Sequence, residues 1–272
     1  MTETAARHYE YVVHDEAHYA RDFDKHLHDS SADFWRRYGG QPDVRGKRVL
    51  DFGSATGGMI HRLMQAGAAS AVGVDLDVGS SNYARQRLTR EWGDRVTILC
   101  QDVRTVAVEP VDLIVSQNTM EHVSPLQEIL DAVVRLCKPG GEMYFGYAPL
   151  WHSPFGHHHN PRTNLPWLHL LRGDRIVLDA LERKIGRKYA SIPDAGFNRA
   201  TASDFRAAFA SQPAEVIALR RNPGSGGWKS LVSQLLLIPA AIPFLEKYLT
   251  TGMYWHLRKM PETVPQDMEI ER

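Results

Sequence analysis

The sequence has little of several features that mark particular protein classes. It contains two cysteines, Cys100 and Cys137, without the paired spacing of a zinc site or the density of a disulfide-stabilised secreted domain. Its 32 basic residues equal its 32 acidic residues, so bulk electrostatics give no reason to expect a nucleic-acid partner. We therefore expect two inert core thiols and no polyanionic substrate.

Long apolar runs are also missing. No stretch reaches the roughly 18 uninterrupted apolar residues of a membrane span, and the first residues lack the basic start and apolar core of a signal peptide. We expect a cytoplasmic protein with no stable membrane insertion. At 272 residues the chain has room for one domain that carries a substantial insertion.

The stretch RVLDFGSATGG at 48–58 organises the rest of the chain. Val49, Leu50 and Phe52 suit a buried strand, and the glycines after them let the backbone approach a ligand closely. Apolar residues at helical spacing follow, so the turn would present free N–H groups and a positive dipole end to a polar ligand. The glycine spacing differs from the G-x-G-x-x-G of dinucleotide sites, which argues against NAD or FAD.

Strands and helices alternate over 47–147 at the spacing of a parallel sheet with crossover helices. Two of these strands end in acids: AVGVD at 71–75, and VTILC followed by Gln101 and Asp102. The pattern predicts an α/β fold with a doubly wound, mostly parallel seven-stranded sheet. Right-handed crossovers would put the glycine turn and the strand-end acids on one edge, and 252–259 would be a last, antiparallel strand.

The ordered set VLDFGSATGG, VGVDLD, the strand-end QD, DLIVSQNTMEHVSP and KPGGEMYF resembles the class I S-adenosylmethionine-dependent methyltransferases of the small-molecule type, over residues 47–147. The resemblance implies S-adenosylmethionine as the methyl donor, with Asp75 on the ribose and Asp102 facing the adenine. The cofactor-binding residues that it implies are Asp51, Gly53, Ser54, Gly57, Asp75, Leu76, Asp102, Val103, Gln117 and Asn118.

Five regions are expected along the chain. They are an N-terminal helical lid (1–46), the Rossmann-like cofactor-binding core (47–147), a substrate-specificity insertion (148–198), the remainder of the core with apolar helices (199–260) and a charged tail (261–272). An aromatic stripe over 15–38 predicts the lid helix, broken near Ser30 and Ser31. This helix would fold over the ligand or only cover the sheet. The insertion should contain short helices at 165–171 and 175–189.

Histidines are the candidates for a catalytic base. Methyl transfer from a sulfonium is an in-line displacement, and a hydroxyl acceptor also requires a base with a pKa near neutral. His157, His158 and His159 follow the fifth strand and His122 follows the fourth, and either place could hold the base. We favour the group at 157–159 and expect a structural or substrate-orienting role for His122. A divalent metal is an alternative for the cluster, but neighbouring residues in extended chain point apart, so we favour none.

These features predict O-methylation of a small hydroxylated acceptor, a sugar, glycoconjugate or secondary metabolite, with a histidine as general base. N- or C-methylation of a small molecule stays open, as does a methyltransferase fold that binds without catalysis. The intact glycines with Asp75 and Asp102 argue against the last. Nucleic acid is not expected, because the fourth strand is followed by SQNT at 116–119 rather than an Asn-Pro-Pro-Tyr-type motif.

Apolar residues are dense over 231–249, where Pro239 and Pro243 predict two short helices. A surface of this kind has to be covered. We expect it to pack under the insertion or against a second copy, in a monomer or homodimer. Shallow docking on a membrane that carries a lipid-linked acceptor is the alternative, with four dispersed cations nearby as weak support.

Overall fold

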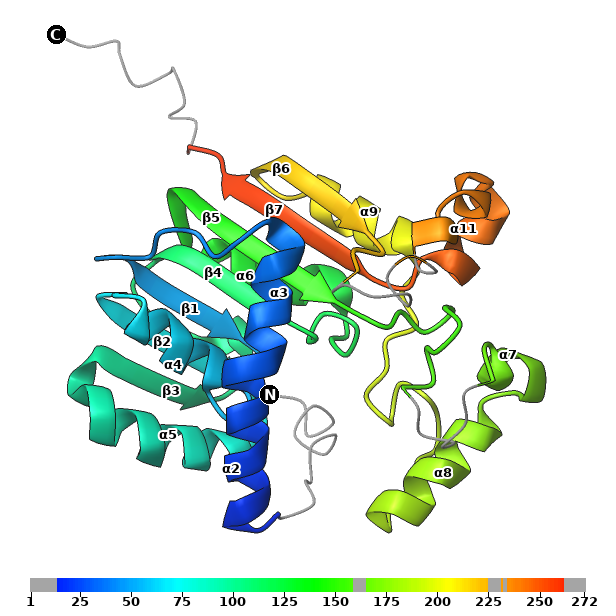
Figure 1. Cartoon of the computed structure of the whole chain (residues 1–272), viewed down its shortest axis with the longest axis horizontal. Coiled ribbons are helices and arrows are strands. Elements are labelled where there is room, and N and C mark those ends of the chain that lie inside the picture. The colour runs from blue at the N-terminus through cyan, green and yellow to red at the C-terminus, as the bar shows by residue number, and fades with distance from the viewer. Residues whose placement is uncertain (1–13, 159–164, 225–230, 232–233, 262–272) are drawn as a thin grey trace, which may run out of the picture.

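A seven-stranded sheet forms the centre of the computed structural model, which describes residues 14–158, 165–224, 231 and 234–261 (Figure 1). The strand order is β3-β2-β1-β4-β5-β7-β6, and β7 runs antiparallel to both its neighbours. The strands are β1 (Arg48–Phe52), β2 (Ser70–Asp75), β3 (Val96–Cys100), β4 (Val111–Gln117), β5 (Cys137–Tyr147), β6 (Ala214–Arg221) and β7 (Met253–Lys259). The predicted doubly wound, mostly parallel sheet is confirmed.

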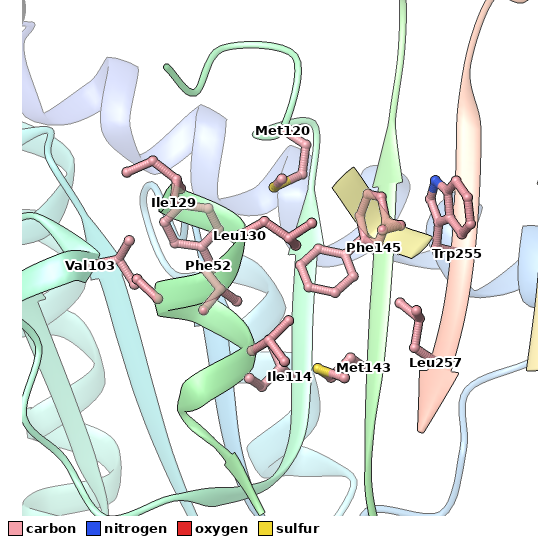
Figure 2. Packing of buried hydrophobic residues seen from close by; sticks show 14 of the residues in the cluster. Phe52, Val103, Ile114, Met120, Ile129, Leu130, Met143, Phe145, Trp255 and Leu257 are labelled. Atoms are coloured by element: carbon pink, nitrogen blue, oxygen red, sulfur yellow. The ribbon is translucent and has the colours of Figure 1, made fainter. Parts of the chain in front are cut away.

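Helices cover both faces of this sheet, as the apolar character of the central strands requires. On one face lie α2 (Glu16–Lys25), α3 (Ser31–Tyr38), α4 (Gly58–Gln65) and α5 (Val78–Trp92). On the other lie α6 (Leu126–Arg135) and α9 (Ala202–Ala210). Figure 2 shows this second core, in which Phe52, Ile114 and Phe145 of three neighbouring strands pack against Leu130 of α6.

Side-chain caps start several of these helices where the sequence changes from strand to helix. Asp77 accepts from the Ser80 N–H at the start of α5. Thr201 and Asp204 form a reciprocal capping box at the start of α9. Each such cap stabilises its helix by about 1 kcal/mol.

The N-terminal lid is one long helical segment with a π-helical turn, His26–Ser30, between α2 and α3. The break predicted near Ser30 and Ser31 is therefore a widened turn. The segment packs directly on the backbone of α4, because a Cβ on Gly58 would lie 2.7 Å from the Leu27 amide nitrogen. Phe34 and Trp35 of α3 are buried against the sheet, so most of the lid covers the sheet face.

Strand β5 begins with one of the two cysteines. Cys137 pairs with Val111 of β4, and a register shift between Val111 and Leu113 accommodates the Lys138–Gly141 stretch. Burial raises the pKa of the Cys137 thiol to about 12, so the thiol stays protonated and inert.

The insertion has a small core of its own. It contains α7 (Leu168–Arg172) and α8 (Arg175–Ile185), both shorter than predicted, and α8 ends at the left-handed residue Gly186. Trp151 and Phe197, from the two ends of the insertion, pack against apolar residues of α8. Pro243 opens the last helix, α11 (Pro243–Leu249), after a 3-10 turn, Pro239–Ala241. Across the described residues, no helix combines the length and apolar character that crossing a bilayer requires.

Candidate functional site

A cavity of about 900 Å³ lies at the carboxyl ends of the parallel strands. Its walls come from the turns after β1, β2, β3 and β4, with His26 from the lid and Pro193 and Gly196 from the end of the insertion. This is the edge at which open α/β sheets bind ligands, and the volume is that of a small-molecule pocket.

All of the predicted cofactor-binding residues except Gly57 line this cavity. They are Asp51, Gly53, Ser54, Asp75, Leu76, Asp102, Val103, Gln117 and Asn118. Gly57 instead faces α5, where a Cβ would lie 2.7 Å from Leu88 Cδ1, and its φ of 86° is one that side-chain-bearing residues rarely adopt. Packing and backbone conformation therefore explain this glycine without any ligand contact.

At the glycine turn, the cavity wall is formed by backbone atoms without a side chain. Gly53 has φ 80°, and a Cβ there would collide with the Thr119 side chain, so both the turn and the close approach of two loops require glycine. Next to it, the buried Ser54 Oγ has no hydrogen-bond partner among the described residues. This hydroxyl lies only 2.8 Å from the position that a Cβ on Gly73 would take, beside Ile60 and Ile98, so the turn also requires a glycine at position 73.

Asp75 holds the glycine turn in shape. One carboxylate oxygen accepts the Ala55 N–H at 2.7 Å and the other accepts the Asp77 N–H at 2.8 Å. Burial raises the pKa of Asp75, and these N–H groups oppose that shift by favouring the carboxylate. The residue thus joins β2 to the turn after β1, and its remaining lone pairs are available to hydroxyl donors in the cavity.

Asp51 is a second buried acid in the cavity wall. Burial, and secondarily the negative charge of Asp75, raise the pKa of Asp51 to about 7. Two neighbouring acids in a poorly solvated site favour a ligand that brings positive charge or hydrogen-bond donors, and disfavour a pyrophosphate.

Asp102 forms an ion pair with a neighbouring side chain. The Arg104 guanidinium donates to both of its carboxylate oxygens, at 2.6 Å for the Nη2 bond to Oδ2, and holds the pKa of Asp102 below its usual range. Arg104 also donates to Glu128 at 3.1 Å. At the opposite wall, the Gln117 side-chain amide donates to the Ser30 carbonyl of the lid at 2.7 Å.

His122 lies in the cavity wall beside the insertion. Its Nδ1 is 2.7 Å from the Gly196 carbonyl oxygen, which can only accept, so Nδ1 carries the proton and Nε2 has the free lone pair. Burial lowers the pKa of His122 below 6.5, although the Gly196 carbonyl opposes the shift. The ring is therefore neutral near pH 7, in the tautomer that leaves Nε2 unprotonated.

The histidines after β5 are placed differently from His122. His157 is fully buried against the His169 ring, with centroids 5.3 Å apart, and does not line the cavity. His158 is half-buried, and its ring centroid lies 5.3 Å from that of His122. His159 lies outside the described residues. Within the described part of the chain, no three His, Cys, Asp or Glu side chains are grouped to hold a metal ion.

Two residues that the sequence interpretation missed connect the His122 loop to the insertion. Asn198 donates to the carbonyls of Met120, at 2.7 Å, and Val123, at 2.9 Å. Glu121 is buried, and neither carboxyl oxygen has a well-formed hydrogen bond to a described residue, although the Ala148 N–H lies near enough to favour the ionised form slightly. Burial raises the pKa of Glu121 to about 8. No local pattern marks Asn198, because its partners lie 75 and 78 residues away in sequence.

Known proteins are similar to this chain over the segment that contains the glycine turn and the first four strands. Residues 49–141 match the family described as "Methyltransferase domain". The ubiquinone biosynthesis O-methyltransferase of Neisseria meningitidis serogroup C is 33% identical over 109 residues, which are 39% of this chain and 46% of that protein. The tRNA1(Val) (adenine(37)-N6)-methyltransferase of Bacteroides fragilis is 30% identical over 116 residues, 35% of this chain and 49% of that protein.

The likeness extends to solved structures. An S-adenosylmethionine-dependent methyltransferase from Mesorhizobium loti has a TM-score of 0.57 at 16% identity, covering 85% of this chain and 99% of that one. The family match thus identifies residues 49–141 as a methyltransferase domain, and the sheet is similar in fold to S-adenosylmethionine-dependent methyltransferases. The chain spans less than half the length of the curated relatives that it matches.

Proposed function

We propose that this protein transfers the methyl group of S-adenosylmethionine to a hydroxyl group of a small acceptor, with His122 as the general base. The observation that carries the proposal is the Nδ1 contact of His122 with the Gly196 carbonyl, in the wall of the cavity that also contains the glycine turn. A neutral histidine with a free Nε2 is the group that a hydroxyl nucleophile needs, because its proton must leave during the displacement.

The residues of the cavity fit this cofactor. S-adenosylmethionine brings an ammonium and a sulfonium, ribose hydroxyls that donate hydrogen bonds, and the methyl group that is transferred. The Asp51 carboxylate would pair with a cationic group, and Asp75 would accept from the ribose hydroxyls. Val103 and Leu76 provide apolar contact for the adenine side.

The dimensions of the site favour a small acceptor. A cavity of about 900 Å³ that also holds the cofactor leaves space for a compact molecule, and the lining residues show none of the cationic density that a nucleic-acid backbone requires. The two curated relatives are named for different acceptors, so they do not choose between them. Sugars, glycoconjugates and hydroxylated secondary metabolites are the acceptors that we propose.

The proposal is tested by measuring release of the demethylated cofactor. The acceptors to be tried are a panel of sugars and of phenolic or polyketide-type hydroxy compounds. His122→Ala should lower turnover of any accepted compound by about a hundredfold or more, because general-base catalysis contributes on that scale. Cofactor affinity, measured by calorimetry, should stay near wild type. His28→Ala, at an exposed histidine of the lid, is the matched control and should leave both unchanged.

The pH profile separates a base from a residue that only shapes the loop. Protonation removes the Nε2 lone pair, so kcat/KM should fall as pH drops through the lowered pKa of His122, below 6.5. This acid limb should vanish in His122→Gln. Wild-type turnover in both His122 variants would reject His122 as the base and return attention to His158.

A further inference from the structure

An apolar face is left uncovered near the C-terminal end of the chain. Its exposed side chains are Leu231, Leu235, Ile238, Ile242 and Phe244, which are between 47% and 73% exposed. Tight backbone turns, such as Ile238 N–H to Leu235 O at 3.2 Å and Ile242 N–H to Pro239 O at 3.1 Å, hold this stretch compact. We call these five side chains the apolar face.

The described part of the insertion does not cover this face, contrary to one expectation from the sequence. It contacts the far end of α11, where the Trp167 indole donates to the Tyr248 carbonyl at 3.1 Å and the His152 ring centroid lies 6.4 Å from that of Tyr248. Ile238 and Phe244 are the most exposed members, at 73% and 70%. Side chains of this size grouped on a surface normally mark a docking site.

Arginines surround a hollow beside the apolar face. Arg36 and Arg37 from α3 and Arg220 and Arg221 from the end of β6 line this hollow of about 400 Å³, together with Pro223, Gly224, Gln234 and Leu237. Leu237 belongs to the same stretch as the exposed apolar side chains. The arginine hollow therefore adjoins the stretch that carries the exposed apolar side chains.

Carboxylates compensate only part of this charge. Asp33 pairs with Arg36 at 2.7 Å, and Glu246 already takes both guanidinium nitrogens of Arg206 while pairing with Arg221 at 2.8 Å. Among the described residues, no ion pair joins Arg37 or Arg220 to a carboxylate; Arg220 donates to the Arg37 carbonyl instead. Counted over the described residues, the hollow thus keeps an excess of positive charge, and guanidinium groups such as that of Arg220 suit phosphate oxygens.

We propose that the apolar face and the arginine hollow together dock this protein on an anionic lipid surface. The apolar side chains would enter the boundary between headgroups and acyl chains, while the arginines bind headgroup phosphates. A second copy fits less well, since a two-fold contact would bring two arginine clusters into one interface whose acids are already paired. This inference does not depend on the proposed reaction.

Co-sedimentation with phosphatidylcholine vesicles, with and without phosphatidylglycerol, tests the proposal at physiological salt. The wild-type protein should sediment with the mixed vesicles and stay in solution with phosphatidylcholine alone. Phe244→Glu should weaken partitioning more than tenfold, because it puts a charge into the apolar layer. Arg220→Ala should weaken it about fivefold, the scale of one cation near an anionic surface.

Leu171→Glu is the matched control, because Leu171 is 79% exposed on α7 and lies outside the face. It should sediment as the wild type does. Circular dichroism melts check the fold of each variant, and Ile238→Glu replaces Phe244→Glu if that variant unfolds. Equal sedimentation on both vesicle types, or unchanged sedimentation of the folded apolar-face variants, would overturn the proposal. The proposal would also be overturned if the protein did not bind vesicles and instead formed dimers that Phe244→Glu disrupts. Analytical ultracentrifugation would detect these dimers.

Discussion

The two ends of the cavity are built by different means. At the cofactor end, Asp75 joins two consecutive strand–turn units through backbone N–H groups of Ala55 and Asp77, only 20 and 2 residues away. At the opposite end, His122 and Asn198 join the loop after β4 to the insertion, across 74 to 78 residues. The first end is therefore a local property of the chain, whereas the second exists only after the insertion has folded onto the core.

The comparison teaches where changes should be tolerated. A glycine turn that is held by hydrogen bonds from the adjacent strand ends keeps its shape whatever the rest of the protein contains. The same turn can therefore bind the same cofactor in many proteins. The loop with His122 depends on a segment that has its own core around Trp151 and Phe197. Variation in that segment would change the acceptor site and leave the cofactor site intact.

Glu121, beside His122 at the insertion end, gives the largest expected effect. A glutamate in the unfolded chain ionises above about 4.5, but the buried group stays protonated up to about 8. Between these values unfolding releases a proton, so rising pH destabilises the fold, by at most about 1.4 kcal/mol per pH unit. Glu121→Gln removes this titration, and its stability relative to wild type should rise from pH 5 to pH 8 in urea unfolding measurements.

Asp112 provides a control, because the pH dependence of its contribution to stability has the opposite sign to that of Glu121. Burial alone would raise the pKa of Asp112, but Lys138 and the Arg48 N–H hold it below its ordinary value. Its contribution to stability is present above that ordinary value and is lost as pH falls. Asp112→Asn should therefore lose stability at neutral pH and approach wild type in acid. A pH-independent difference between Glu121→Gln and wild type would contradict the buried neutral carboxyl.

Asp75→Ala should affect the cofactor end alone. It removes a charge-assisted acceptor, so S-adenosylmethionine affinity should fall by about 1.5–3 kcal/mol, roughly 10- to 150-fold in Kd. Calorimetry measures the loss, with the exposed Asp43→Ala as control. Undiminished affinity in Asp75→Ala would remove Asp75 from the site and leave it a purely structural link between β2 and the glycine turn.

Arg104→Gln is expected to have the smallest effect. Its ion pair with Asp102 is partly exposed, with side chains 36% and 26% accessible, and pairs of this kind contribute about 0–1 kcal/mol. Because Asp102 keeps its carboxylate, cofactor affinity should change by no more than a few-fold in the same calorimetric titration. A loss as large as that of Asp75→Ala would mean that the guanidinium itself contacts the ligand.

The sequence predicted the sheet and the residues that line its carboxyl edge because period-2 and helical patterns, together with the glycine turn, are local signals. The last antiparallel strand, predicted at 252–259, is β7 (Met253–Lys259). The helix predicted at 175–189 ends early, because Gly186 adopts a left-handed conformation. Asn198 could not be found, since side-chain bonds to distant carbonyls leave no trace in spacing. The Nε2 lone pair of His122 likewise depends on Gly196, a partner 74 residues away.

The π-helical turn in the lid has a consequence for chain length. Tyr19 and Tyr38 lie nineteen residues apart, so in a regular α-helix their directions would differ by roughly 100° beyond whole turns. The widened turn, His26–Ser30, contains one extra residue, which offsets this rotation. The aromatic residues before and after the turn therefore lie on the same side of the helix. A chain one residue shorter at this point would keep the same stripe on an uninterrupted helix. The lid could thus lose one residue there while the side chains on either side keep their places on the sheet and the glycine turn.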